Sequence, residues 1–292
     1  MGNFVVFFGC NKKQLPYLNE IKKKKYRIIL IDKNKKNLGI KISDNYFCSS
    51  YLDYKKLDKI YDKIKKKKIS NIFTASSQFA HMGASYLAKK LRIPYPPLNS
   101  IDICLNKNRF YKIFKKHNLE IPLNIRIKNK RELITRLKDK NKKIFFYLKS
   151  DYGKSPNYLY KGKPNELLKK KINWKKDQYL KKNYILQKNF SGKNLRINVF
   201  KNKHVIYDFY TNKLLNIDNF PLIRKNNIIS KFINIGKDLK MKNWLLKFDL
   251  ILGKNTYQVL DIGIDPPSRM IKHWKKMNKD FVNFYLNLYF KK

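Results

Sequence analysis

The sequence predicts an α/β fold over residues 1–100 and an α+β fold over residues 101–292. In the first part, short apolar runs alternate with segments of helical spacing, which is typical of parallel strands joined by crossover helices. In the second part, apolar runs follow one another across short turns, which indicates antiparallel strands. The hydrophobic content of 43% is ordinary for a globular protein and excludes wholesale disorder.

Short apolar runs followed by turn residues predict the strands of the first part. The predicted strands are Phe4–Phe8, Arg27–Asp32 and Asn71–Ala75, and the predicted helices are Gln14–Lys25, Asp53–Lys68 and Gln78–Leu91. Ligands of open parallel sheets bind at the carboxyl ends of the strands. The residues expected at those ends are Gly9-Cys10-Asn11, Asp32 and Ser76-Ser77.

The turn after the first strand does not match a dinucleotide-binding fingerprint. Its sequence GCNKKQ lacks the second and third glycines of GxGxxG, although Asp32 falls near the usual acidic position. A nicotinamide cofactor is therefore not expected at this sheet.

The second part contains helices, strands and one clear hairpin, without an internal repeat. The predicted helices are Lys107–His117, Arg131–Lys140, Ile228–Leu239 and Phe281–Tyr289. The predicted strands are Ile144–Leu148, a strand-like stretch Tyr184–Tyr210 with turns at Ser191–Lys193 and Lys201–Lys203, and a hairpin over Trp244–Ile262. Residues 212–227 are expected to form a polar, loop-like insertion that helps to shape an acceptor pocket.

The net charge of +48 suggests a nucleic-acid partner, because Lys and Arg neutralise phosphates. The basic residues are 59 Lys and nine Arg, however, and Arg is the better bidentate reader of phosphates and bases. Lys, Asn, Ile, Tyr and Phe are all abundant, and their codons are rich in A and T. We therefore interpret the lysines as surface residues encoded by an AT-rich genome. Nucleic-acid or anionic-membrane binding is the alternative, and a nucleic-acid partner is not expected.

The cysteines and the apolar runs bear on the cellular compartment. Cys10, Cys48 and Cys104 are scattered and odd in number, which suits a reducing compartment without disulfides. No apolar run approaches the roughly 20 residues that a membrane-spanning helix needs, and the N-terminus lacks the basic region of a signal peptide. We expect a cytoplasmic protein without a transmembrane segment. The sequence does not indicate the oligomeric state.

Two acidic residues stand out in the hairpin LLKFDLILGKNTYQVLDIG. A three-residue turn at Gly253–Asn255 would place Asp249 opposite Val259, with Asp261 as a diagonal neighbour on the same face. Two carboxylates on one half-buried face repel each other unless a cation bridges them, and Mg²⁺ prefers such oxygen ligands. The alternative is a pair of water-facing aspartates, or a register that separates them.

Basic and polar residues elsewhere are suited to a nucleotide. Lys149 ends the strand IFFYL before a glycine-containing loop, and Lys107 begins a helix; either ammonium could contact phosphates. In so lysine-rich a chain, both could equally be surface residues. The polar hinge Gln187-Lys188-Asn189-Phe190 follows an apolar strand, and backbone amides in such a hinge can read an adenine edge. The next strand carries Asn194 and Arg196 on one face.

The order of these pieces resembles the ATP-grasp superfamily over nearly the whole chain. The resemblance implies a Rossmann-like, parallel pre-ATP-grasp domain over residues 1–100 and a two-lobed ATP-grasp domain over residues 101–292. The small lobe would cover about residues 120–188 and the large lobe about residues 189–292. Members of this superfamily hold ATP between two α+β lobes and commonly join a carboxylate to an amine through an acyl phosphate.

The resemblance also implies a role for each residue that matches a motif. Lys107 and Lys149 match the lysines that contact phosphates, Gln187, Lys188, Asn189 and Phe190 the adenine hinge, Asn194 the ribose-contacting position, Asp249 and Asp261 the metal ligands, and Arg269 the basic residue after the last metal motif. The family usually ends Glu-x-Asn, whereas this chain reads Asp261-Ile262-Gly263. Asp265, two residues further on, is the candidate replacement for the missing Asn.

These assignments predict an ATP-dependent carboxylate–amine ligase that uses Mg²⁺ (or Mn²⁺). Arg269, together with Arg196, would hold the substrate carboxylate or the charge that develops at the acyl carbon. The substrates would be a small-molecule carboxylate and an amine, neither of which the sequence identifies. The departures from the family pattern leave the number of metal ions open and admit a weakened enzyme. The alternatives are a non-catalytic nucleotide- or RNA-binding protein on the same fold, and a kinase-like transfer to another acceptor.

Overall fold

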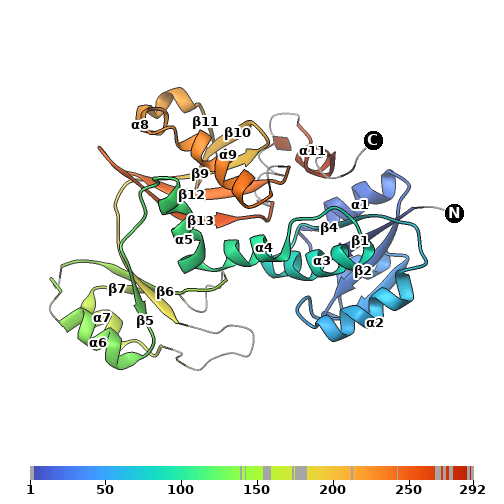
Figure 1. The fold of residues 1–292 in the computed structure, drawn as a ribbon, viewed down its shortest axis with the longest axis horizontal. Helices are drawn as coiled ribbons and strands as arrows, with labels where there is room; N and C mark the ends of the chain where they lie inside the picture. The colour runs from blue at the N-terminus through green and yellow to red at the C-terminus, as the bar shows by residue number, and fades with distance from the viewer. Residues whose placement is uncertain are drawn as a thin grey trace.

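The computed structural model describes residues 3–138, 140–141, 143–153, 159–172, 174, 183–211, 213–241, 243–266, 271, 274–275, 279–287 and 290. Within these residues the strands form three sheets, one at the N-terminal end of the chain and two in the remainder (Figure 1). The mixture of one parallel sheet and two antiparallel sheets confirms the predicted fold class.

The first sheet is parallel and has the strand order β3-β2-β1-β4. Its elements are β1 (Phe4–Phe8), α1 (Leu15–Lys23), β2 (Arg27–Asp32), a 3₁₀ turn (Leu38–Lys41), β3 (Asn45–Cys48), α2 (Tyr54–Ile64), β4 (Ile69–Thr74) and α3 (Gln78–Leu91). Alternate side chains of β1 face opposite sides of this sheet. Val5 and Phe7 join the core under α1, whereas Val6 and Phe8 join the core under α2 and α3.

The first part differs from the sequence prediction in two places. β3 was not predicted, because its four residues NYFC are only partly buried and do not form an apolar run. The helix predicted over Asp53–Lys68 ends at Ile64, and the next strand begins at Ile69. The lysines between them form the turn, in which the Lys67 amide donates to the Ile64 carbonyl at 2.8 Å.

The second sheet, which we call the small-lobe sheet, is antiparallel with the order β5-β8-β6-β7. Its elements are β5 (Asn124–Ile127), α6 (Lys130–Lys138), β6 (Phe146–Ser150), β7 (Leu159–Gly162), α7 (Pro164–Lys169) and β8 (Tyr184–Lys188). Phe146, Leu148 and Leu186 pack against Leu133 of α6 and Leu167 of α7. The helices therefore cover one face of this sheet, and its other face is turned away from them.

The third sheet, the large-lobe sheet, is antiparallel with the order β11-β10-β9-β12-β13. Its elements are β9 (Lys193–Phe200), β10 (Lys203–Asp208), β11 (Leu214–Leu215), a 3₁₀ turn (Ile217–Asn219), α8 (Pro221–Lys225), α9 (Ile228–Asp238), β12 (Leu246–Leu252) and β13 (Tyr257–Gly263). Residues 212–227 are therefore not the loop-like insertion that the sequence suggested, because β11, the 3₁₀ turn and α8 lie within them.

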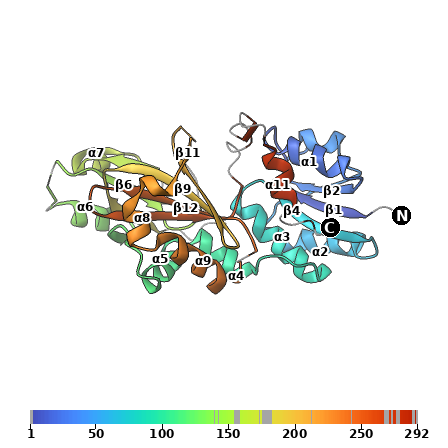
Figure 2. The same cartoon turned by 90° about the horizontal axis from the view of Figure 1, so that it is seen from above.

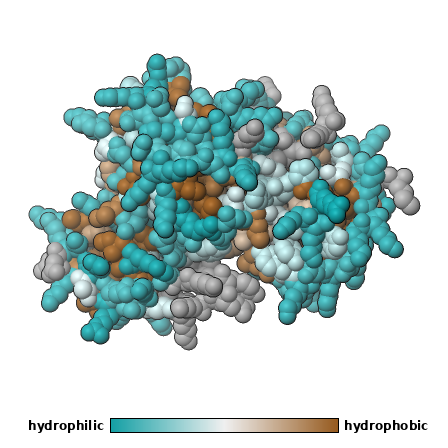
Figure 3. Space-filling model, in the orientation of Figure 1, coloured by the Kyte–Doolittle hydropathy of each residue, from teal (hydrophilic) through white to brown (hydrophobic). Residues whose placement is uncertain are grey.

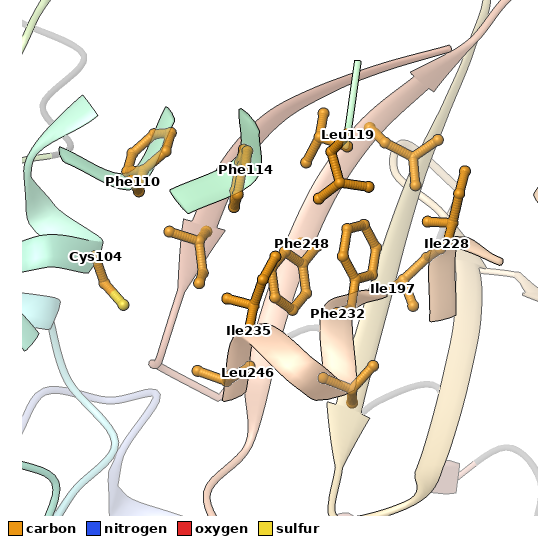
Figure 4. Close-up of a cluster of buried hydrophobic side chains, with 14 of the residues drawn as sticks. Cys104, Phe110, Phe114, Leu119, Ile197, Ile228, Phe232, Ile235, Leu246 and Phe248 are labelled. Carbon is orange, nitrogen blue, oxygen red and sulfur yellow. The ribbon is translucent and has the colours of Figure 1, made fainter. Parts of the chain in front are cut away.

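One face of the large-lobe sheet carries the main hydrophobic core (Figure 4). Phe232 of α9 stacks on Phe248 of β12, with ring centroids 3.9 Å apart and ring planes 3° from parallel. Phe114 of α5 (Lys107–Lys116) contacts the same Phe248 ring from the other side of the cluster, at 6.1 Å between centroids. The helices α5 and α9 therefore occupy this face, and polar functional groups are left to the opposite face.

Helices connect the first sheet to the rest of the chain at two places. α4 (Leu98–Leu105) leads from the first sheet into α5, and the predicted domain boundary at residue 100 falls inside it. The C-terminal helix α11 (Phe281–Asn287) returns to the first sheet beside α1 (Figure 2). There the rings of Tyr285 and Tyr17 pack together, with their centroids 5.9 Å apart. The division of the chain into two domains at that boundary stays a prediction.

The lysines lie overwhelmingly at the surface. Hydrophilic side chains cover most of the face drawn in Figure 3. Among the described lysines, Lys107 and Lys247 are those that are buried, each with 5% of its surface exposed. These two are therefore the lysines that the fold sets apart from the general basic surface. No described helix is long and apolar enough to cross a membrane.

Candidate active site

The large-lobe sheet has one apolar face and one polar face. Strand residues point alternately to either side, so the neighbours of the core residues Ile197 and Phe248 face away from α9. The side chains that share this opposite face are Asn194, Arg196, Asn198, Lys247, Asp249 and Asp261. Such a concentration of charged and amide groups on an inner strand surface is the first sign of a functional site.

Asp249 and Asp261 lie directly opposite each other on β12 and β13. The sequence analysis placed Asp249 opposite Val259, but Leu250 occupies that position. The register shifts between Asp249 and Leu250, because Leu260 is an extra residue that forms a bulge in β13. The bulge brings the carboxylates closer than predicted, since directly opposed residues have Cβ atoms about 4.5–5.5 Å apart.

Arg196 of β9 binds Asp249 with both arms of its guanidinium group. Arg196 Nε lies 2.5 Å from Asp249 Oδ1, and Arg196 Nη2 lies 2.7 Å from Oδ2. Burial acts to lower the pKa of Arg196, but the hydrogen bonds and charge of Asp249 outweigh it and raise that pKa. The guanidinium is therefore permanently charged and held in one orientation.

Lys247 lies two residues before Asp249 on the same face, and the sequence analysis missed it. Its ammonium Nζ lies 2.8 Å from Asp265 Oδ2, and the side chain is buried. Asp265 was proposed as a metal ligand, but its carboxylate is paired with this lysine. Within the described chain, no group of three or more His, Cys, Asp or Glu side chains is placed to hold a metal ion. Asp249, Asp261 and Asp265 therefore do not form a three-carboxylate cluster.

A cavity of about 420 Å³ lies between the polar face and the carboxyl ends of the first sheet. The large lobe contributes Arg196, Phe209, Lys247 and Asp265, and the first sheet contributes Asn11, Lys13, Gln14, Ala75, Ser76 and Ser77. The strand ends that the sequence marked as ligand-binding positions are thus brought against the large lobe. The volume is within the range of small-molecule sites.

The wall that the first sheet contributes is well ordered by hydrogen bonds. Gln14 Nε2 donates to the Ala75 carbonyl at 2.9 Å, and Gln14 Oε1 accepts from the Asn11 amide at 3.1 Å. Gln78, at the start of α3, donates from Nε2 to the Ile262 carbonyl of β13 at 3.2 Å. These contacts join the two walls, so the position of Asp261 and its neighbours is coupled to the first sheet.

Asp32 does not serve as a ligand-reading residue at this sheet end. Its carboxylate accepts hydrogen bonds from the Cys10 amide at 2.9 Å, from Asn37 Nδ2 at 2.6 Å and from the Asn34 amide at 2.9 Å. It therefore shapes the turn that follows β1.

Lys149 and Gln187 share the face of the small-lobe sheet that the helices leave uncovered. Lys149 is paired with Ile185, and Gln187 with Tyr147, across β6 and β8. Ile185 belongs to the core beneath the large lobe, not to the core under α6 and α7. This face is therefore directed toward the large lobe, as a nucleotide held between two lobes would require.

Lys107 fastens the start of the loop that follows β6. Its Nζ donates to the Gly153 carbonyl at 2.9 Å, and its backbone amide donates to the Asp151 carbonyl at 2.8 Å. The Gly153 amide in turn donates to the Leu105 carbonyl at 2.7 Å. The two predicted phosphate-binding lysines thus lie at the two ends of one short segment, Lys149 to Gly153.

The predicted hinge starts later than the sequence suggested. Gln187 and Lys188 belong to β8, and the Asn189 amide still donates to the Phe145 carbonyl at 2.8 Å. The chain leaves the sheet only after that residue, because the bonds of β8 extend through it. Phe190 then packs against the hairpin turn. Its ring lies so close to Gly253 that a Cβ atom added there would be 2.9 Å from the Phe190 ring.

Tyr111 of α5 connects the two lobes and was also missed by the sequence analysis. Its hydroxyl donates to the Leu260 carbonyl in the β13 bulge at 2.8 Å. Burial raises the pKa of Tyr111, the charge of Asp261 raises it further, and the nearby Gln187 amide lowers it. The Tyr111 side chain is therefore close both to Asp261 of the large lobe and to Gln187 of the small lobe.

The remaining predicted residues are Asn194 and Arg269. Asn194 is half-buried at the start of β9, and its Nδ2 donates to the Gly192 carbonyl at 3.4 Å. Arg269 lies outside the described residues. The structure thus brings Arg196, Asp249 and Asp261 together and adds Lys247 and Tyr111 to them.

No protein-family model matches the sequence, and no curated protein matches it. Solved structures do match. An L-amino acid ligase from Bacillus licheniformis has a TM-score of 0.71 at 13% identity, covering 99% of this chain and 74% of its own. D-alanine–D-alanine ligase from Bacillus anthracis has a TM-score of 0.64 at 15% identity, covering 99% of this chain and 96% of that ligase. N5-carboxyaminoimidazole synthetase from Staphylococcus aureus, complexed with ADP, has a TM-score of 0.68 at 12% identity, covering 95% of this chain and 74% of that synthetase.

Sequence identities this low establish the fold alone. The three similar structures share the fold of this chain over 95–99% of its length. The protein therefore has the ATP-grasp fold.

Proposed function

We propose that the protein is an ATP-dependent ligase that activates a carboxylate as an acyl phosphate for attack by an amine. The observation that carries this proposal is the polar face of the large-lobe sheet. There Arg196 and Lys247 line a cavity of about 420 Å³, and the opposed Asp249 and Asp261 share the same face of the sheet. The similar structures include an L-amino acid ligase, a D-alanine–D-alanine ligase and a synthetase with bound ADP, which supports the same chemistry.

The nucleotide would lie between the small-lobe and large-lobe sheets. Lys149, on the sheet face directed to the large lobe, and Lys107, at the base of the loop, would neutralise its phosphates. The residues from Gln187 to Phe190 would contact the base, and Asn194 the ribose. The position of Gln187 supports this placement, because its side chain and Asp261 of the large lobe both act on Tyr111.

The metal ligands that we propose are Asp249 and Asp261. Mg²⁺ or Mn²⁺ is commonly held by one or two carboxylates together with phosphates and waters, so two opposed carboxylates fit. Arg196 donates one hydrogen bond to each oxygen of Asp249, and each carboxylate oxygen can accept a second partner. The ion would neutralise charge on the transferring phosphoryl group. Asp265 would instead orient Lys247.

The substrate carboxylate would bind in the cavity beside Arg196 and Lys247, with Arg269 as a further proposed contact. One carboxylate oxygen forms a bond to the γ-phosphorus, the bond from that phosphorus to the ADP oxygen breaks, and ADP leaves. The amine nitrogen then bonds to the acyl carbon, the bond to the phosphate oxygen breaks, and the nitrogen loses a proton. Lys247 and Arg196 stabilise the negative charge that develops on the acyl oxygen.

The experiment that tests this function measures ADP release from ATP and Mg²⁺ with a panel of carboxylic acids and amines. We expect release that requires both an acid and an amine, and that falls about 10²–10³-fold in Asp261→Asn. Asp218→Asn is the matched control, because Asp218 is exposed and pairs with the exposed Arg224. A protein that neither binds ATP nor releases ADP under any of these conditions would contradict the proposal.

The cellular setting that we propose is the cytoplasm. Cys10, Cys48 and Cys104 are all free thiols, which suits a reducing compartment. Burial, with the nearby charge of Asp32, raises the pKa of the Cys10 thiol to about 11, so this residue is a structural thiol and not a nucleophile.

A further inference from the structure

We propose that Asp265 binds the amine substrate of this enzyme and accepts a proton from its nitrogen as the amide forms. The inference rests on the proposed function, because it concerns the second substrate of that same site. It goes beyond the orientation of Lys247, since it brings Asp265 into contact with a reacting atom. It is carried by the charges that line the cavity of about 420 Å³ and by the spacing of the Lys247–Asp265 ion pair.

The charged residues that line this cavity are mostly basic. Lys13, Arg196 and Lys247 are positive, and among the described residues that line the cavity Asp265 is the only carboxylate. The two substrates of the proposed ligase carry opposite charges, because near neutral pH an acid is a carboxylate and an aliphatic amine is an ammonium. The positive groups suit the acid, so Asp265 is the group through which the cavity complements the amine.

The two acids on the polar face of the large-lobe sheet are engaged elsewhere. Both oxygens of Asp249 accept hydrogen bonds from Arg196, and neither Asp249 nor Asp261 is among the residues that line the cavity. Both are the proposed ligands of the metal ion, whose positive charge would repel an ammonium. Of these three carboxylates, Asp265 is therefore the one suited to the amine.

The Asp265 carboxylate is accessible, whereas its lysine partner is not. The side chain of Lys247 has 5% of its surface exposed, and that of Asp265 has 25%. Lys247 Nζ lies 2.8 Å from Asp265 Oδ2 and 3.5 Å from the Asp265 carbonyl oxygen, so the lysine is anchored to both the side chain and the backbone of this residue. A carboxylate has about four acceptor sites, and one ammonium does not exhaust them.

The length of this ion pair places the two reacting groups next to each other. Lys247 is proposed to hold the acyl oxygen, and Asp265 would hold the amine nitrogen, each at a charge-assisted distance of about 2.7–2.9 Å. The two protein atoms that hold them are themselves 2.8 Å apart. The amine nitrogen is thereby brought to about 3–3.5 Å from the acyl carbon, which is the separation of a near-attack geometry.

The proton balance of the reaction also requires an acceptor. The bound ammonium gives one proton to solvent, and the neutral amine then bonds to the acyl carbon while phosphate leaves with the electrons of the broken bond. The nitrogen stays positive until it loses a second proton, which passes to a carboxylate oxygen of Asp265 and from there to water. A carboxylate paired with a lysine is basic enough for this step, because the nitrogen of the adduct is far more acidic than a free ammonium.

The test compares two nucleophiles in the full-length protein with ATP and Mg²⁺. Concentrated hydroxylamine is mostly uncharged near neutral pH and traps acyl phosphates without help from a protein, so the hydroxamate that it forms reports the first half of the reaction. Carboxylic acids are screened with hydroxylamine, and the acid that reacts fastest is then paired with primary aliphatic amines. Amide formation with these amines reports the whole reaction.

Replacement of Asp265 should separate the two nucleophiles. In Asp265→Asn we expect kcat/KM for the amine to fall about 10²–10³-fold. Hydroxamate formation and the KM for the acid should stay within about threefold of the wild type, because the acid subsite is kept. Asp218→Asn, in an exposed ion pair, is the matched control and should change none of these quantities.

The possible results separate this inference from the function on which it rests. An equal loss with hydroxylamine and with the amine, or a rise in the KM for the acid, would mean that Asp265 acts only through Lys247. Either result overturns the inference and leaves the ligase intact. A wild-type protein that forms neither hydroxamate nor amide overturns both.

A measurement on the wild type keeps the inference testable if Asp265→Asn fails to fold. The alcohol with the carbon skeleton of the best amine lacks the ammonium charge that Asp265 would bind. It should inhibit amide formation with an inhibition constant at least about tenfold above the KM for the amine. An alcohol that binds as tightly as the amine would show that no carboxylate reads the nitrogen, and the inference would then be wrong.

Discussion

Arg196 and Asp249 form a two-armed ion pair across β9 and β12, in the middle of the polar face. Both side chains are mostly buried, with 17% and 16% of their surfaces exposed. An ion pair held this firmly fixes a positive and a negative group at a known spacing, with the second carboxylate, Asp261, directly opposite. Positioning of charge before reaction is what electrostatic catalysis requires.

The first prediction concerns the geometry of this pair. Arg196→Lys keeps the positive charge but loses the two parallel hydrogen bonds. We expect the rate of ADP release at saturating substrate to fall about 10²-fold, with a loss of folding stability of only about 1–2 kcal/mol. Arg224→Lys, in an exposed pair with Asp218, is the matched control and should change neither quantity. Full activity in Arg196→Lys would show that the reaction does not depend on the two parallel hydrogen bonds from Arg196 to Asp249.

The second prediction concerns the buried lysine of the cavity. Lys247→Met preserves the length and apolar stem of the side chain but removes its charge. We expect the KM for the carboxylate substrate to rise by about tenfold to 100-fold, because the cavity loses one of its positive groups. Lys213→Met changes an exposed lysine beyond β10 and should leave KM unaltered. An unchanged carboxylate KM in Lys247→Met would remove this residue from the acceptor site.

How far the sequence predicted this site can be judged from its strands. The alternation along the strands predicted Asn194 and Arg196 on one face of β9 and the two aspartates on one face of the hairpin, and the register agrees with both. The bulge at Leu260 was not predictable, because an extra residue in a ladder depends on the partner strand. The opposition of Asp249 and Asp261 therefore needed coordinates, although their presence in one hairpin did not.

The sequence did not indicate the roles of Lys247 and Tyr111, because each role depends on burial or on a contact with a distant part of the chain. Lys247 is one of 59 lysines, and only its burial separates it from the others. Tyr111 reaches a carbonyl 149 residues away in sequence, a contact that no local pattern encodes. Asp265 was read as a metal ligand because it follows the last acidic motif, whereas its partner lies 18 residues earlier on a neighbouring strand.

The third prediction concerns stability and pH. His81 of α3 is buried, and burial lowers its pKa to about 4, with Asp265 opposing this shift and Lys247 adding to it. An unfolded histidine titrates near 6.5, so between pH 6.5 and pH 4 the unfolded chain binds more protons than the folded one. The free energy of unfolding should therefore fall as the pH falls through this window, by up to about 3 kcal/mol.

Denaturant unfolding at several pH values measures this effect. In His81→Gln the titrating group is gone and a polar atom is kept for the Tyr95 hydroxyl, which lies 2.9 Å from His81 Nδ1. Between pH 6.5 and pH 4, the free energy of unfolding should therefore fall less in this variant than in the wild type. The difference should be most of the fall of about 3 kcal/mol that is expected from His81. His204→Gln, on the exposed end of β10, is the comparison: burial also lowers the pKa of His204, but less than that of His81, so this variant should lose only a small part of the slope. Identical slopes in all three proteins would mean that the pKa of His81 does not differ between the folded and unfolded states, which would contradict the prediction.

The fourth prediction concerns the contact between the lobes at Tyr111. Tyr111→Phe keeps the ring but removes the hydroxyl that binds the Leu260 carbonyl, so that a buried carbonyl loses its donor. We expect a loss of about 1–3 kcal/mol in folding stability and a rise of about tenfold in the KM for the nucleotide. The second effect follows because the hydroxyl is close to Asp261 and Gln187, the groups proposed to hold the metal and the base.

The control for this variant separates stability from nucleotide binding. Tyr46→Phe removes a hydroxyl that donates to the Asp32 carbonyl at 3.0 Å, in the first sheet and away from both lobes. It should lower stability in the same direction and leave the nucleotide KM unchanged. If the two variants weaken nucleotide binding equally, the effect of Tyr111 is a general loss of stability. If only Tyr111→Phe does so, the hydroxyl positions the bulge that carries Asp261, and the bridge between the lobes is part of the nucleotide site.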